Sequence, residues 1–126
     1  MPNPALVDQF VATVVSGDYV GAIERFYAQD ASMQENQSPP RVGRQELVRN
    51  EQGVMAMFPR ITCEIAAPPL ISDDQVSIQW RFVFTAAGGE TRSLHEVAWQ
   101  RWAGDKIVEE RFFYDPNQMT EETSRR

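Results

Sequence analysis

The sequence has little of several residue types that would otherwise point to a function. It contains one cysteine, Cys63, so no internal disulfide bond can form. His95 is the only histidine, and a lone histidine supplies neither a typical metal site nor, without a nearby nucleophile, a catalytic triad. Gly88, Gly89 and Gly104 lie in predicted turns and form no phosphate-binding loop. We therefore predict no metal and no cofactor, and a structural or interfacial role for His95.

Basic residues are outnumbered by acidic ones, with 12 Lys and Arg against 18 Asp and Glu, so the formal net charge is −6. Such a balance argues against nucleic acid and against an anionic membrane surface as partners. No apolar run is long enough to span a bilayer, and no basic residues precede the apolar stretch near the amino terminus, as they would in a secretion signal. Together with the single thiol, these features predict a cytoplasmic protein.

The length and composition are those of one folded domain. The chain has 126 residues, of which 42% are hydrophobic and 24% charged, and it carries enough bulky aromatic side chains to build a core. We predict a single domain over residues 1–117, followed by a polar tail over residues 118–126.

Helical periodicity marks the first half of the chain. Apolar residues recur at helical spacing over residues 4–16, after Asn3 as the N-cap, and over residues 18–28, after Gly17 and with Asp18 as the N-cap. Gly43 opens a third predicted helix over residues 44–58.

Alternation with a period of two marks the second half of the chain. We predict strands over residues 61–67, 75–86, 91–102 and 106–114, joined by glycine-containing turns. A short strand is expected over residues 31–34. Three helices followed by antiparallel strands predict an α+β fold with helices on one face of a sheet.

The order of these elements resembles the nuclear transport factor 2-like superfamily. This superfamily includes ketosteroid isomerases, SnoaL-like polyketide cyclases, limonene epoxide hydrolase and scytalone dehydratase. The likeness is carried by Gly17-Asp18, the run from Phe26 to Gln37, Gly43, and the run from Gly104 to Pro116. It implies a cone-shaped, curved antiparallel sheet packed on three N-terminal helices and enclosing a pocket.

The resemblance also implies which strand residues face that pocket. Trp102, Val108 and Tyr114 would point inward, and the inward-facing residues expected to bind a ligand are Met33, Trp80, Phe82, Phe84, Glu96, Ala98, Gln100 and Phe112. Val97, Trp99 and Phe113 would then lie on the convex face. Because a contiguous apolar patch is rarely left in water, we expect a homodimer through that face.

Glu35 is the first candidate for catalysis. It follows the short predicted strand and matches the position at which ketosteroid isomerases carry their general-base aspartate. A carboxylate partly desolvated by Met33, Trp80 and Phe82 could remove a proton next to a carbonyl group. The alternative is that Glu35 is a solvated loop residue.

The rest of the isomerase site is missing. Its oxyanion-binding tyrosine matches Phe10 and its protonated acid matches Ala98, and neither can donate a hydrogen bond. The aspartate of the epoxide hydrolase matches Phe112, and Asp115 is expected to be a turn residue before Pro116. The resemblance therefore excludes a standard member of either enzyme class.

Glu110 is the second candidate, because the resemblance places this carboxyl group on an apolar wall. There it needs a raised pKa or a partner, for which Arg101, Arg111 and Gln100 are within reach. The alternative is a one-residue bulge that turns Glu110 to solvent. Tyr114 is the remaining candidate for a polar contact with a ligand.

Three hypotheses follow for the function. The first is cofactor-independent acid–base chemistry (isomerisation, cyclisation or dehydration) on a small hydrophobic carbonyl compound, with Glu35 as base, and Glu110 or Tyr114 as its polar partner. The second is binding of a small hydrophobic molecule without chemistry. The third is a dimerisation domain whose pocket is filled by its own side chains.

Overall fold

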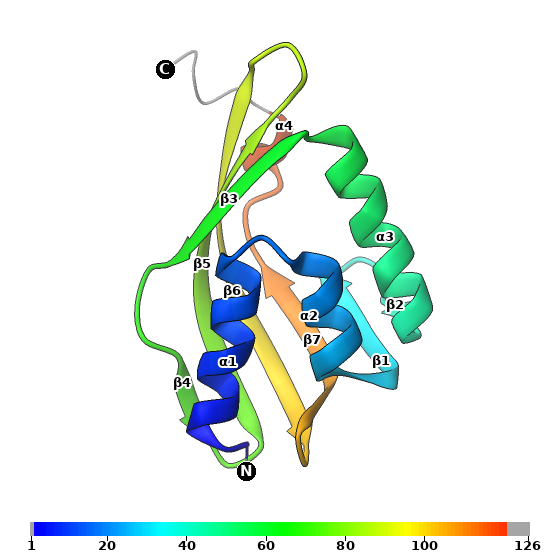
Figure 1. Ribbon diagram of the computed structural model, residues 1–126, viewed down its shortest axis with the longest axis vertical. Helices are drawn as coiled ribbons and strands as arrows, with labels where there is room; N and C mark the ends of the chain where they lie inside the picture. The colour runs from blue at the N-terminus through cyan, green and yellow to red at the C-terminus, as the bar shows by residue number, and fades with distance from the viewer. Residues whose placement is uncertain (1, 121–126) are drawn as a thin grey trace.

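The computed structural model describes residues 2–120 and shows one curved sheet with helices packed against it (Figure 1). The helices are α1 (Pro4–Val15), α2 (Tyr19–Phe26), α3 (Arg44–Met57) and α4 (Asn117–Thr120). The strands are β1 (Tyr27–Glu35), β2 (Arg41–Val42), β3 (Arg60–Ile65), β4 (Leu70–Ser72), β5 (Gln75–Thr85), β6 (Thr91–Ala103) and β7 (Lys106–Phe113). Within residues 2–120, no helix has the length and apolar character needed to cross a membrane.

The helix starts follow the capping signals in the sequence. Asn3 caps α1 by accepting a hydrogen bond of 2.8 Å from the backbone N–H of Ala5, and Asp18 caps α2 through the N–H of Gly21 at 3.0 Å. Gly17 has a φ of +92°, which glycine adopts without strain. The two predicted N-caps are therefore confirmed.

The sheet has seven strands, and the strand order is β2-β1-β7-β6-β5-β3, with β4 paired to β5. Most neighbours are antiparallel, but β1 runs parallel to β7, a pairing that the sequence did not predict. The second predicted helix was also too long, because Tyr27 has extended backbone angles and begins β1. The guanidinium group of Arg44 donates a hydrogen bond of 3.2 Å to the carbonyl oxygen of Tyr27.

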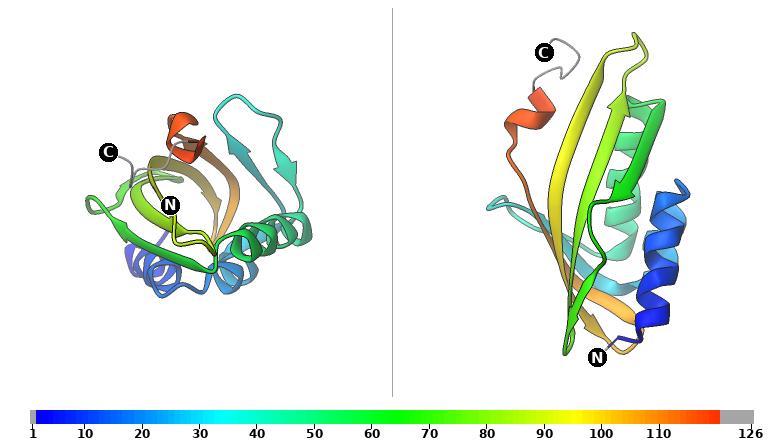
Figure 2. Two further views of the ribbon diagram at one scale, coloured as in Figure 1. Left: turned by 90° about the horizontal axis from the view of Figure 1, so that it is seen from above. Right: turned by 90° about the vertical axis from the view of Figure 1, so that its left-hand side faces the viewer.

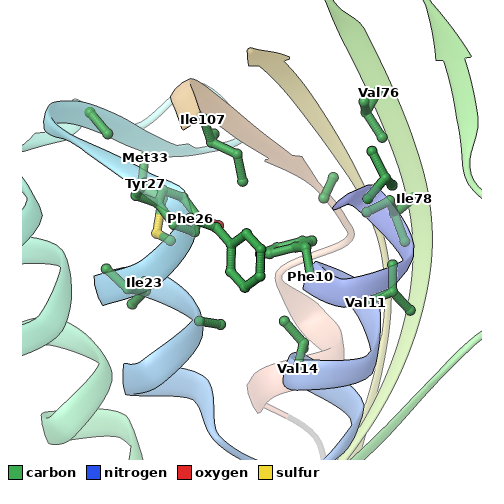
Figure 3. Packing of buried hydrophobic residues seen from close by; sticks show 14 of the residues in the cluster. Phe10, Val11, Val14, Ile23, Phe26, Tyr27, Met33, Val76, Ile78 and Ile107 are labelled. Carbon is green, nitrogen blue, oxygen red and sulfur yellow. The ribbon is translucent and has the colours of Figure 1, made fainter. Parts of the chain in front are cut away.

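Helices α1, α2 and α3 lie side by side along one side of the curved sheet (Figure 2). Apolar side chains from α1, α2 and the sheet meet between these layers (Figure 3). Phe10 lies at the centre of this cluster, with its ring centroid 5.4 Å from that of Phe26, 6.1 Å from Tyr27 and 6.2 Å from Trp102, all edge-on. Such edge-to-face contacts add to the stabilisation that burial provides.

A bulge in β7 corrects one part of the predicted strand facing. Trp102 pairs with Ile107, whereas Arg101 pairs with Glu109, so Val108 is the extra residue on β7. Ile107, not Val108, therefore occupies the core and is fully buried. The bulge lies before Glu110 and leaves that residue facing inward, so it does not turn Glu110 to solvent.

The segment predicted as a polar tail begins with helix α4, which packs on β6. The side chain of Gln118 accepts a hydrogen bond of 2.8 Å from the N–H of His95 and donates one of 3.2 Å to its carbonyl oxygen. Asp115 is exposed and accepts a hydrogen bond from the N–H of Asn117 at 3.0 Å, as expected for a turn residue. The remainder of the predicted tail, residues 121–126, lies outside the described residues.

The convex face of the sheet carries large apolar side chains. Val83 on β5, Val97 on β6 and Phe113 on β7 are 39%, 40% and 42% exposed, and Val97 pairs directly with Phe113. Trp99 lies in the same row as Val97, and its indole N–H donates a hydrogen bond of 2.8 Å to Gln75. His95 lies on the same face of β6 and is exposed.

Candidate functional site

A cavity of about 450 Å³ lies between the concave face of the sheet and the helices. Its walls are mostly apolar, and the aromatic side chains that form them are Phe10, Tyr19, Tyr27, Phe58, Trp80, Phe82, Phe84, Phe112 and Tyr114. Four carboxyl groups interrupt this apolar lining, those of Glu35, Glu51, Glu96 and Glu110. A cavity of this size with a few converging polar groups is typical of a small-molecule site.

The structure brings most of the predicted site residues together around this cavity. The predicted residues in its lining are Met33, Glu35, Trp80, Phe82, Phe84, Glu96, Glu110, Phe112 and Tyr114. Two predicted ligand-binding residues, Ala98 and Gln100, do not reach the cavity. Both point to the concave side but are completely buried, because the side chains of α1 and Trp102 cover that part of the sheet.

Glu35 is not a freely solvated loop residue, because β1 extends through it. Its carboxylate accepts a hydrogen bond of 2.6 Å from the guanidinium group of Arg41 and a short hydrogen bond from the hydroxyl group of Tyr114. Arg41 and Tyr114 thus fix the position of the Glu35 side chain at the edge of an apolar cavity.

A turn after β1 brings Tyr114 to Glu35. Asn36 has a φ of +50°, a left-handed conformation that asparagine tolerates. Its N–H donates a hydrogen bond of 2.8 Å to the carbonyl oxygen of Phe112, and its side-chain oxygen accepts one of 3.0 Å from the N–H of Tyr114. The turn therefore continues the parallel β1–β7 pairing to the end of β7.

Glu110 is almost completely buried, at 1% exposure, and both of its carboxyl oxygens have partners. One oxygen is in a short hydrogen bond with the hydroxyl group of Tyr27, and the other accepts a hydrogen bond of 2.7 Å from the amide of Gln100. Burial raises the pKa of Glu110 to about 7, although both hydrogen bonds lower it. Of the predicted partners, Gln100 is therefore correct.

The two arginines named as possible partners of Glu110 point elsewhere. Arg101 forms an ion pair with Glu109 at 3.1 Å, and Arg111 donates hydrogen bonds to Asn36 and Gln37. Both arginines alternate with the inward-facing residues of their strands, so their charges lie on the opposite face of the sheet.

Glu96 differs from the other carboxyl groups because it is buried without a protein partner. It is 9% exposed and lines the cavity, and no group within residues 2–120 donates a hydrogen bond to it. Burial, followed by the nearby charges of Glu110, Glu35 and Glu51, raises the pKa of Glu96 to about 8. At neutral pH Glu96 is therefore mainly a neutral acid that can donate a hydrogen bond into the cavity.

Two tyrosine hydroxyl groups of the cavity also remain protonated. Burial and the charge of Glu110 raise the pKa of Tyr27 well above its usual value. Burial, together with the hydrogen bond to Glu35 and its charge, raises the pKa of Tyr114. Each hydroxyl group can thus serve as a hydrogen-bond donor over the whole physiological pH range.

Four charged or amide side chains of the cavity lining were not predicted as site residues from the sequence, namely Arg41, Asn50, Glu51 and Arg92. Arg41 lies outside every predicted strand and helix, but it pairs with Met33 in the short β1–β2 hairpin. Glu51 lies on α3, and burial followed by the charge of Glu35 raises its pKa. Its spacing from Leu47 and Val54, four residues after one and three before the other, places it on the apolar face of the helix and could have revealed it.

The fold and the cavity together define a pocket-forming α+β domain of the nuclear transport factor 2-like type. The sequence profile of the SnoaL-like domain matches residues 7–110 of the chain. The chain therefore belongs to the SnoaL-like family. No curated protein matches the chain in sequence.

Solved structures with the same fold cover nearly the whole chain. A protein from Jannaschia sp. CCS1, provisionally named a SnoaL-like polyketide cyclase, is 13% identical, with a TM-score of 0.79 over 92% of this chain and 90% of its own. One from Mesorhizobium loti with a similar provisional name is 25% identical, with a TM-score of 0.74 over 90% and 100% of the two chains. An NTF2-like protein of unknown function from Burkholderia pseudomallei is 15% identical, with a TM-score of 0.80 over 94% and 95%.

Proposed function

We propose that this protein catalyses cofactor-independent acid–base chemistry on a small, flat, apolar carbonyl compound bound in the cavity. The observation that carries the proposal is the pairing of two different carboxyl groups in one apolar space. Glu35 forms an ion pair with Arg41 and accepts a hydrogen bond from Tyr114, whereas Glu96 is buried, protonated at neutral pH and without a protein partner. A carboxylate paired with an arginine and a neutral carboxylic acid in the same cavity are suited to act as base and acid.

In the proposed reaction Glu35 removes a proton from the carbon next to the carbonyl group. The electron pair of the broken C–H bond forms a C=C bond, and the carbonyl oxygen gains negative charge. Glu96 donates a hydrogen bond or its proton to that oxygen. Glu35 then returns its proton to a carbon atom, the C=O bond re-forms, and any proton held by the oxygen goes back to Glu96. Isomerisation, cyclisation and dehydration can all begin with this enolisation step.

This assignment changes the partner of Glu35 that the sequence suggested. Glu110 has both oxygens occupied by Tyr27 and Gln100, so it is less free than Glu96 to contact a ligand. Tyr114 contacts Glu35 itself and positions that carboxylate. Glu96 becomes the acid, and the aromatic side chains become the walls that exclude water.

Exchange of hydrogen for deuterium tests the proposal without knowledge of the product. Flat ketones with protons next to the carbonyl group are incubated with the protein in deuterated water, and exchange is followed by NMR. We expect the wild-type protein to accelerate exchange for a compound that fits, and Glu35→Gln to abolish the acceleration. Glu96→Leu should reduce it about a hundredfold to a thousandfold, as the loss of one oxyanion donor does.

The matched control is Glu64→Gln, because Glu64 is an exposed glutamate on β3 outside the cavity. This variant should exchange the ketone at the wild-type rate. Exchange that persists in Glu35→Gln, or ketones that bind the wild-type protein and never exchange, would contradict the proposed reaction.

The second candidate is binding of a small hydrophobic molecule without chemistry, which the aromatic walls favour. Trp80, Phe82 and Phe84 form a continuous row, with ring centroids 5.9 Å and 5.7 Å apart. For a pure binding module, Phe82→Ala should weaken affinity for an apolar ketone, while Glu35→Gln leaves affinity unchanged. Calorimetric titration of both variants separates this candidate from the enzyme.

We also propose that the protein forms a homodimer through the convex face of its sheet and acts in the cytoplasm. Val83, Val97 and Phe113 support the dimer, because they leave large apolar surface exposed on adjacent strands. The unpaired thiol of Cys63 is in keeping with a reducing compartment.

A further inference from the structure

We propose that the hydroxyl group of Tyr27 is a second hydrogen-bond donor to the ligand's carbonyl oxygen, and that the buried chain Trp102–Gln100–Glu110 positions its proton. This inference rests on the proposed function, since it adds a donor to the same site. Tyr27 would contact the substrate, whereas the other three would be positioning residues. Trp102 lies at the buried end of this chain, and its indole group fixes the direction of each hydrogen bond that follows.

The indole group of Trp102 determines the orientation of Gln100. An indole N–H can donate a hydrogen bond but cannot accept one. The group that lies 3.0 Å from it must therefore be the side-chain oxygen of Gln100. The amide nitrogen of Gln100 consequently points the other way and lies 2.7 Å from Oε2 of Glu110.

The orientation of Gln100 determines which oxygen of Glu110 can carry a proton. An amide nitrogen only donates, so Oε2 of Glu110 must accept. When Glu110 is neutral, its proton is therefore on Oε1. That oxygen is the one in contact with the hydroxyl group of Tyr27.

One hydrogen lies between Oε1 of Glu110 and the hydroxyl oxygen of Tyr27. Which of the two oxygens it is covalently bound to depends on whether Glu110 is ionised or neutral. When Glu110 is ionised, the hydroxyl group of Tyr27 donates to Oε1 and has no hydrogen left for a ligand. When Glu110 is neutral, its own proton donates to the tyrosine oxygen. The hydroxyl hydrogen of Tyr27 can then turn to the cavity, which both residues line.

A second donor meets a need that Glu96 alone does not satisfy. Oxyanions that form in enzymes are usually held by more than one donor. The positions of Phe10 and Ala98, from which donors would come in a ketosteroid isomerase, carry none. Tyr27 lies beside Phe10, with ring centroids 6.1 Å apart, and approaches the cavity from β1.

The surroundings of Glu110 bring its ionisation near neutral pH. Burial raises the pKa of Glu110 to about 7, while the hydrogen bonds from Tyr27 and Gln100 oppose this rise. The titratable groups near it come from three elements, namely Tyr27 of β1, Glu96 of β6 and Glu51 of α3. Below that pKa Glu110 is neutral, so the Tyr27 donor is available there and is withdrawn as the pH rises.

The test uses 2-acetylnaphthalene labelled with ¹³C at its carbonyl group, a flat ketone that does not itself titrate. Isotope-edited infrared spectra report hydrogen bonding to the bound carbonyl group, and fluorescence titration gives its dissociation constant. All variants carry Glu96→Gln, so that the ionisation of Glu96 does not contribute. We expect a lowered carbonyl frequency well below the Glu110 pKa of about 7, and about tenfold weaker binding well above it.

Two substitutions separate the donor from the residue that positions it. Tyr27→Phe should remove the lowered frequency and the pH dependence together. Glu110→Gln should have the opposite effect, because its amide group accepts from Gln100 and donates to the tyrosine oxygen at every pH. Binding in this variant should stay tight, with a lowered frequency, on both sides of neutrality.

Gln100→Leu provides a readout that a purely structural role would not change. It removes the donor to Oε2 and so disfavours ionised Glu110, which should move the midpoint of the pH dependence upward. If Glu110→Gln does not fold, as judged by near-ultraviolet circular dichroism, this shift carries the test.

An unchanged carbonyl frequency in Tyr27→Phe, an unmoved midpoint in Gln100→Leu, or no binding of the probe to the parent protein would each overturn the inference. None of these results would affect deuterium exchange that depends on Glu35. Conversely, exchange that survives in Glu35→Gln would overturn the proposed function while a tyrosine-dependent frequency remained.

Discussion

Arg41 on β2 holds the carboxylate of Glu35 on β1 at 2.6 Å, across the short hairpin that ends beside the cavity. The two side chains are 35% and 32% exposed, so this ion pair should add less than about 1 kcal/mol to stability. Its larger effect is on geometry, because the guanidinium group fixes the position of the proposed base.

Arg41→Gln should therefore reduce catalysis without unfolding the protein. We expect deuterium exchange of a bound ketone to slow about tenfold. Glutamine cannot form the ion pair that fixes the Glu35 carboxylate. Arg49→Gln is the matched control, since Arg49 pairs with Glu46 on the exposed side of α3. Equal exchange rates for both variants would show that Arg41 does not act on the base.

Glu96 should make stability depend on pH in a specific direction. Its pKa is raised to about 8 in the folded protein, so the folded state binds a proton more tightly than the unfolded state. The corresponding stabilisation is complete at low pH, below the unfolded value, and is lost as the pH rises through about 8. Glu96→Gln cannot lose a proton and should lack this decline.

Urea unfolding at several pH values checks this prediction. As the pH rises, the free energy of unfolding of Glu96→Gln should increase relative to that of the wild-type protein by at most about 1.4 kcal/mol per pH unit. The gain should begin near the unfolded pKa and stop near pH 8. A difference that stays constant between the two proteins would mean that Glu96 titrates normally in the folded state.

Local signals in the sequence were enough to predict the starts of α1, α2 and α3 and the facing of β5 and β6. Capping residues such as Asn3 and Asp18 act within one turn of helix, and the alternation along residues 75–85 acts within one strand. Strand alternation and the family resemblance were likewise enough to assign Glu35, Glu96 and Glu110 to the cavity side. Their roles could not be assigned in this way.

What the sequence could not show depends on contacts between distant segments. The parallel pairing of β1 with β7 joins Tyr27 to Ile107, and no local pattern specifies such a partner. The bulge at Val108 appears only through the pairing of β7 with β6. The difference between Glu96 and Glu110 likewise depends on neighbours, because Tyr27 and Gln100 satisfy one carboxyl group and nothing within residues 2–120 satisfies the other.

Phe10 should be the most sensitive apolar residue of α1. It is 2% exposed and packs edge-on against three aromatic rings. Phe10→Ala should lower the free energy of unfolding by about 3–5 kcal/mol, because the surrounding rings cannot close the space it leaves. Val15→Ala, at an exposed site on the same helix, should change it by less than about 0.5 kcal/mol. Similar losses in urea unfolding for both variants would contradict this packing.

The apolar surface around Val97 and Phe113 should be the dimer contact. These residues pair across β6 and β7 and are 40% and 42% exposed. Symmetric dimers bury the same patch from each subunit, and a charge placed in such a patch must lose its water on association. Val97→Glu should therefore produce monomers of 14.4 kDa in light scattering, while the wild-type protein has twice that mass.

Val15→Glu is the control for added negative charge, because Val15 is 44% exposed at the end of α1, away from the convex face. It should remain dimeric, and thermal unfolding should confirm that both glutamate variants are folded. A monomeric wild-type protein would contradict the dimer directly. Dissociation by both variants would show that net charge, rather than this face, controls association, because the two substitutions add the same charge at different surfaces.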